Sequence, residues 1–123
     1  MNLPEKLNIG NIEQFLDKKE IIEMTAAQIM KDFGMFGVEL SFSGNIEGAY
    51  DELQNQLITQ IEELQQRNEE LLLSILYQVD ISKVDIQKTA VQFPHFSFVE
   101  VVAHQIIFRD LKKVLYRIYY RNK

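Results

Sequence analysis

Six residues in the middle of the chain are separated alternately by four and three positions, which is the spacing of a heptad repeat. The pattern predicts a helix that presents one narrow apolar face to a partner helix. Leucine occupies the three d positions, and the three a positions hold two isoleucines and one asparagine. We call this set the heptad seam, and its members are Leu57, Ile61, Leu64, Asn68, Leu71 and Ile75.

Asn68 is the polar member of the heptad seam. An asparagine at an a position lowers stability but fixes the register and the number of helices that associate. We therefore expect the seam to form between subunits of a homo-oligomer, with a dimer favoured. On this interpretation, replacing Asn68 with Leu raises the melting temperature and blurs the oligomeric state.

The composition indicates one globular domain over residues 1–123. Apolar residues make up 46% of the chain and charged residues 25%, which is typical of globular proteins. The chain has no cysteine, which excludes intrachain disulfides, thiolate metal ligands and cysteine nucleophiles. The sequence begins without an apolar leader, and no apolar stretch approaches the ~20 residues of a membrane span. We therefore expect a cytoplasmic protein that does not enter the membrane.

Apolar periodicity predicts three long helices, over residues 11–33, 45–78 and 97–120. For the first helix, Asn11 is expected to act as the N-cap with Gln14 three positions later. The second helix carries the heptad seam. The simplest architecture is an all-α, antiparallel three-helix bundle in which the 45–78 helix is the long central member.

Two further N-terminal signals stand out in the C-terminal half of the chain. Ser97 and Glu100 form the pattern of a capping box at the start of the third helix. Ser82 and Asp85 form a variant of the same pattern, which predicts a short helix that ends before Pro94.

Residues 37–43 differ from the rest because apolar and polar residues alternate strictly there. Alternation is the period of a half-buried strand, yet a lone strand needs a partner for its backbone groups. Two alternatives follow: an extended loop across the helices, which we favour, or a strand paired with its copy in a second subunit.

The net charge of −5 conceals a charge asymmetry. Residues 109–123 carry six basic side chains and one acidic side chain, a balance of +5, so residues 1–108 carry −10. Basic residues recur every four positions along the last helix, with tyrosines beside them. Such a surface can hold phosphates or an acidic partner, although cations near a helix C-terminus also favour the helix dipole. This basic stripe consists of Arg109, Lys113, Tyr116, Arg117, Tyr120 and Arg121.

Chemistry-bearing motifs are sparse. Glu100 and His104 lie one helical turn apart and could both ligate a metal, but a lone histidine on an apolar helix face is more often hydrogen-bonded core. Asp32-Phe33-Gly34 resembles a kinase tripeptide without the other kinase motifs, and we read it as the end of a helix. We therefore predict no enzyme activity, no catalytic residues, no metal site and no cofactor.

Three functions of different classes remain open. The leading hypothesis is a homo-oligomeric protein–protein interaction module with an unidentified protein partner. The first alternative is a nucleic-acid-associated helical protein that uses the basic stripe. The second is a metal-binding helical enzyme centred on Glu100 and His104.

Overall fold

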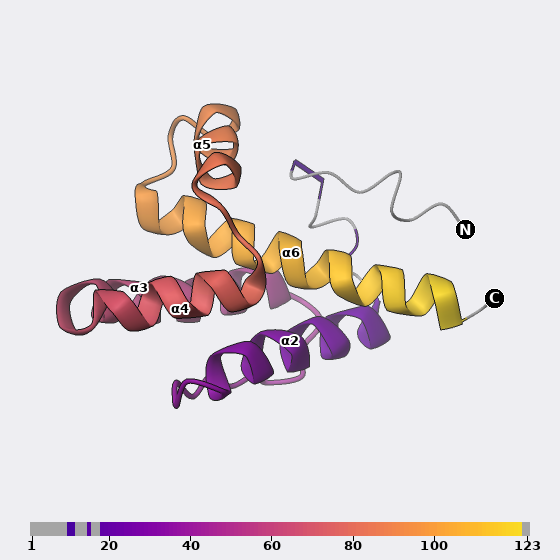
Figure 1. Cartoon of the computed structure of the whole chain (residues 1–123). Coiled ribbons are helices and arrows are strands. Elements are labelled where there is room, and N and C mark those ends of the chain that lie inside the picture. Colours follow the sequence, from indigo (N-terminus) through magenta and orange to yellow (C-terminus); the bar gives the residue numbers. More distant parts are fainter. Residues whose placement is uncertain (1–9, 12–14, 16–17, 122–123) are drawn as a thin grey trace.

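The computed structural model describes residues 10, 11, 15 and 18–121, and over these residues it is all-helical, with no strand. Five helices are described, as labelled in Figure 1. They are α2 (Lys19–Gly34), α3 (Ala49–Arg67), α4 (Glu69–Val79), α5 (Lys83–Gln92) and α6 (Phe98–Arg121). The expected all-α class is therefore confirmed for the described residues. The middle one of the three expected long helices corresponds to two helices, α3 and α4, and α5 is the expected short helix.

The first described helix, α2, begins at Lys19 and ends at Gly34. This helix begins eight residues after the predicted start at Asn11, and the predicted capping partner Gln14 lies outside the described residues. The expected stop is at the right place, since Gly34 is the last residue of the helix. The apolar face of α2 is fully buried and includes Ile22, Ile29 and Phe33.

The predicted helix over 45–78 is two helices, which corrects the idea of one long central member. The chain leaves the helical conformation at Asn68, where φ is −157° and ψ is 76°. The side chain of Asn68 accepts a hydrogen bond from the backbone N–H of Leu71 at 3.1 Å, so the asparagine is the N-cap of α4. The chain reverses there, and α3 and α4 lie beside each other (Figure 1).

Both predicted capping boxes of the C-terminal half are present. The Ser82 hydroxyl accepts from the Asp85 backbone N–H, and the Asp85 carboxylate accepts from the Ser82 backbone N–H. At the start of α6, the Glu100 carboxylate accepts from the Ser97 N–H at 2.8 Å, and the Ser97 hydroxyl accepts from the Glu100 N–H at 3.2 Å. These reciprocal bonds satisfy backbone donors that the first helical turn leaves without partners.

Within the single chain, residues 38–45 form an extended loop against α3. The alternation of the segment places Val38, Leu40 and Phe42 against the core, with polar residues between them exposed. The Gln56 side chain accepts from the Ser41 N–H at 3.0 Å and donates to the Ser41 carbonyl. One carboxamide therefore supplies the backbone partner that a neighbouring strand would otherwise provide.

The helix α6 is the centre of the structure. It contacts α2, α3, α4 and α5, and it crosses between α5 and the other helices (Figure 1). Every residue from Val101 to Ile107 is buried, so this part of the helix has neighbours on all sides. The core cluster draws on α2, α3, α4 and α6.

Candidate functional site

The apolar residues of the heptad seam lie mostly within the core of the single chain. Leu57, Ile61, Leu64 and Ile75 are buried and belong to one cluster, whereas Leu71 is half-buried. Because α3 and α4 fold back on each other, both halves of the seam reach the same core. The helix-to-helix packing that the spacing predicts is thus found, in these residues, within one chain.

Asn68 does not lie in a continuous apolar face. It is exposed and caps α4, as described above. The physical reason is local: residues 65–70 contain no apolar side chain that would hold a continuous helix against a neighbour, and asparagine competes well for backbone N–H groups. The predicted register role at an a position is therefore replaced by a capping role.

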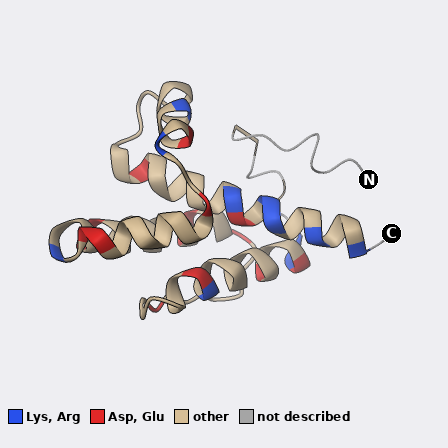
Figure 2. Ribbon diagram, in the orientation of Figure 1, with Lys and Arg blue, Asp and Glu red and all other residues tan. Residues whose placement is uncertain are grey.

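Three cations of the basic stripe, Lys113, Arg117 and Arg121, contact α2. Both α6 and α2 carry basic and acidic residues, as the colours in Figure 2 show. Arg121 forms an ion pair with Glu20 at 2.8 Å, and Arg117 donates to the Gln28 side-chain oxygen at 2.8 Å. The end of α6 thus lies beside the start of α2, so the two helices are antiparallel. Both arginines therefore make contacts within the chain, between α6 and α2.

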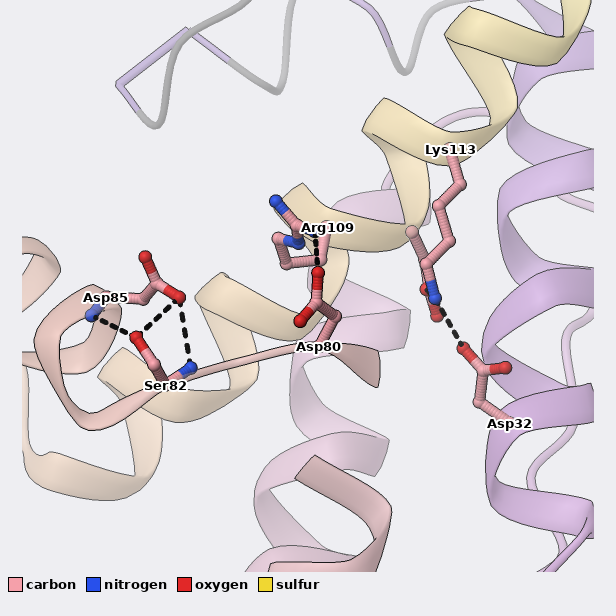
Figure 3. Close-up of polar contacts among 7 residues, drawn as sticks. Asp32, Asp80, Ser82, Asp85, Arg109 and Lys113 are labelled. Carbon is pink, nitrogen blue, oxygen red and sulfur yellow. Dashed lines mark hydrogen bonds and ion pairs between the residues drawn. The ribbon is translucent and has the colours of Figure 1, made fainter. Parts of the chain in front are cut away.

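Arg109, at the other end of the stripe, pairs with Asp80 at 2.7 Å (Figure 3). Asp80 follows α4 in the left-handed conformation with φ of 68°, which aspartate tolerates better than most residues. A carboxylate beside a helix C-terminus is unfavourable, and the Arg109 guanidinium offsets that charge. The pair ties the end of α4 to α6.

The tyrosines of the stripe lie near the end of α6. The rings of Tyr116 and Tyr120 are stacked with centroids 6.2 Å apart, and Tyr119 meets Tyr120 edge to face. Tyr120 is exposed, whereas Tyr116 and Tyr119 are half-buried. The predicted tyrosines of the basic stripe therefore lie together, and the neighbouring Arg117 and Arg121 already contact side chains of α2.

Lys113 connects the stripe to two buried carboxyl groups that sequence reasoning missed. Its Nζ lies 3.7 Å from Asp32 Oδ2, as Figure 3 shows, and 3.3 Å from Asp110 Oδ1. Asp32 is 1% exposed and Asp110 is 0% exposed. Burial, together with the neighbouring Asp32 carboxyl, raises the pKa of Asp110 to about 8. We call Asp32 and Asp110 the buried carboxyl pair.

A signal for the buried carboxyl pair was present in the sequence. Asp110 falls between the apolar positions Ile107 and Val114, at helical spacing from both, and Asp32 follows Ile29 by three positions. An acid on an apolar helix face is unusual, because burial of an unpaired charge is costly. The pattern shows each acid separately, but not that the two meet.

Glu100 and His104 do not converge on one point. The Glu100 carboxylate is held by Ser97 in the capping box, and this hydrogen bond lowers the pKa of Glu100. His104 is buried, and its Nδ1 lies 2.5 Å from the Tyr50 hydroxyl. The rings of Phe93 and Phe96 pack against it. Among the described residues, no group of three or more His, Asp or Glu side chains could hold a metal ion.

A groove of about 510 Å³ opens between α4, α5 and the start of α6. Its floor contains the buried Leu72 and Leu76, and its rim contains Leu73 and Phe98, which are 56% and 54% exposed. Sequence reasoning missed this groove, because it exists only where α5 stands apart from α4. Glu69 and Lys83 belong to its lining, from α4 and α5 respectively.

None of the helices in the described part of the chain contains an apolar stretch that could span a lipid bilayer. Comparison with known proteins gives no family model, no curated relative and no solved structure that matches this chain.

Proposed function

We propose that the protein is a homo-oligomeric protein–protein interaction module, and that two copies associate through the groove between α4 and α5. The observation that carries this proposal is the apolar groove with exposed Leu73 and Phe98 on its rim. Exposed apolar patches of this kind, with polar residues around them, are typical of protein interaction sites. A cytoplasmic location is part of the same proposal and rests on the sequence alone.

The exposed face of α4 supplies a matching projection. Leu73 and Tyr77 lie one helical turn apart, and they are exposed large hydrophobic side chains, at 56% and 88%. In a two-fold dimer the same surface is used by both copies, so each copy inserts its α4 side chains into the groove of the other. This places the interface on Leu73 and Tyr77 in place of the buried heptad seam.

The charges of the groove favour a second copy as its occupant. Glu69 contributes a negative charge from α4, and Lys83 contributes a positive charge from α5. Neither side chain forms an ion pair with another described residue. In the proposed dimer, Glu69 of one copy faces Lys83 of the other, and the two-fold axis repeats this contact to give two intersubunit pairs. Lys83 is also the first residue of α5, where the helix dipole disfavours a cation and an approaching carboxylate is favourable.

A charge-swap experiment tests this arrangement. Glu69→Lys and Lys83→Glu should each be monomeric in sedimentation, because like charges then face each other across the axis. An equimolar mixture of the two variants should form a heterodimer, because both intersubunit pairs become complementary. Failure of the mixture to associate, when the wild type is dimeric, would assign the dimer to another surface.

A second substitution tests the apolar part of the interface. Leu73→Asp should convert the dimer to a monomer, because a carboxylate would be buried in the groove of the partner. Met35→Asp is the matched control, since Met35 is 58% exposed and does not line the groove. A monomeric wild type at micromolar concentration would overturn the proposal and leave a different protein as the occupant of the groove.

A further inference from the structure

The buried carboxyl pair brings two acids and one base together at the interface between α2 and α6. Asp32 comes from α2, whereas Asp110 and Lys113 come from α6, and both carboxyls approach the same Nζ. If both acids were ionised, the cluster would carry a net charge of −1, with both carboxylates almost fully buried and only the Lys113 side chain, 32% exposed, in reach of water. An uncompensated buried charge is strongly destabilising.

The other cations nearby are directed elsewhere. Arg109 pairs with Asp80 at the end of α4, and Arg117 contacts Gln28 on α2. No charged side chain of α3, α4 or α5, among the described residues, forms an ion pair with either carboxyl. Lys113 is therefore the cation that the described structure offers to the pair.

The buried carboxyl pair also has too few hydrogen-bond donors for its oxygen atoms. The Gln28 amide donates to Asp32 Oδ1 at 3.0 Å, but Asp32 Oδ2 and both Asp110 oxygens accept no hydrogen bond from the described residues. A carboxylate has only acceptors, whereas a protonated carboxyl also has an O–H donor. One proton placed between the two carboxyls would supply the missing donor and remove the surplus charge.

We propose that Asp32 and Asp110 share one proton at neutral pH, so that Lys113 alone balances the pair, and that loss of this proton weakens the α2–α6 interface. Binding of this proton then stabilises the native state, as binding of a ligand would. Two carboxyls at close range hold one proton much more tightly than an isolated carboxyl does. The cluster lies at the α2–α6 interface, outside the lining of the groove, so the inference does not depend on the proposed dimer.

Infrared difference spectroscopy of the folded full-length chain tests the shared proton directly. The wild type should show the C=O band of a protonated carboxylic acid near neutral pH, and the band should disappear as the pH rises into the alkaline range. Asp110→Asn should remove the band. Asp32→Asn should remove it as well, because Lys113 then balances the remaining Asp110 carboxylate one to one.

Asp51→Asn is the matched control, because Asp51 is an exposed aspartate on α3, and it should leave the band unchanged. Absence of the band in the wild type at neutral pH would overturn the proposal. Its persistence in Asp32→Asn would also overturn it, because Asp110 would then be protonated through burial alone.

Urea unfolding supplies the second readout. The unfolding equilibrium constant of the wild type should rise by roughly tenfold or more between about pH 6 and pH 8 and then level off, because over this range the native state holds a proton that the unfolded chain has already lost. In Asp110→Asn and Asp32→Asn the rise should be several times smaller. An equal rise in all three proteins would contradict a role of the proton at the α2–α6 interface. If an Asn variant does not fold, the pH titration of the wild-type band and stability still decides the question.

Discussion

At the scale of single residues, Asn68 shows that the structural role of a side chain depends on the conformation of its backbone. At an a position of a continuous helix, its amide would face a partner helix and fix the register. In the structure, the backbone leaves the helix at Asn68, and the amide oxygen caps α4 by accepting from Leu71. The expected effect of a substitution changes sign accordingly.

Asn68→Leu should lower the free energy of unfolding by about 1 kcal/mol, because leucine cannot cap the first turn of α4. Urea unfolding monitored by circular dichroism measures the change. Asn55→Leu on α3 is the control, since Asn55 is exposed and its side chain makes no hydrogen bond to another described residue. An increase in the melting temperature of Asn68→Leu would restore the heptad interpretation.

At the scale of elements, the stability of α5 depends largely on the hydrogen bonds at its N-terminus. Of its described residues, Thr89 alone is buried, with its hydroxyl 2.6 Å from the Gln105 amide oxygen. A helix of 10 residues with so little burial is marginal on its own, so the Ser82–Asp85 capping box contributes a large share of its stability. By contrast, α6 is surrounded by neighbours and is stabilised by packing.

Ser82→Ala should destabilise α5 more than the rest of the molecule, by about 1 kcal/mol, because alanine lacks the hydroxyl that accepts from the Asp85 N–H and donates to the Asp85 carboxylate. Hydrogen exchange should therefore accelerate several-fold at the amides of α5, with little change in α6. Ser74→Ala serves as the control, since the Ser74 hydroxyl donates within α4 to the Glu70 carbonyl and caps nothing. Uniform acceleration over all helices would show that α5 does not open separately.

At the scale of the whole molecule, three perturbed carboxyls shape the dependence of stability on pH. Hydrogen bonds from the backbone of Ser82 and Ser97 lower the pKa of Asp85 and Glu100 respectively, so their stabilising effect is present above the ordinary pKa and is lost as the pH falls. Asp110 acts in the opposite direction. Its pKa is raised from 3.8 to about 8, so its contribution is complete below 3.8 and is lost as the pH rises towards 8.

The free energy of unfolding should consequently reach its maximum in mildly acidic solution, between about pH 4 and 6, and decline on both sides. A series of urea titrations from about pH 3 to pH 9 measures this curve. In Asp110→Asn the alkaline decline should be reduced, and the acid decline should remain. A wild-type maximum above neutral pH would show that Asp110 is ionised in the native protein.

The sequence alone determined the features that depend on contacts within a few residues. The helical class, the Ser82–Asp85 and Ser97–Glu100 capping boxes and the end of α2 at Gly34 all follow from local hydrogen bonding and apolar period. The alternation of residues 37–43 likewise predicted which side chains turn inwards. Such interactions form between neighbours in sequence, so their pattern can be read before the fold is known.

Only the tertiary structure decided which distant groups meet. Asp32 and Asp110 come from the first and last described helices, and nothing in either local sequence specifies that both approach Lys113. The chain reversal at Asn68 likewise sends the heptad seam into the core of its own chain, and the position of α5 opens the groove beside Leu73. Burial and charge pairing depend on the packing of whole helices, and periodicity describes the face of a helix without naming its neighbour.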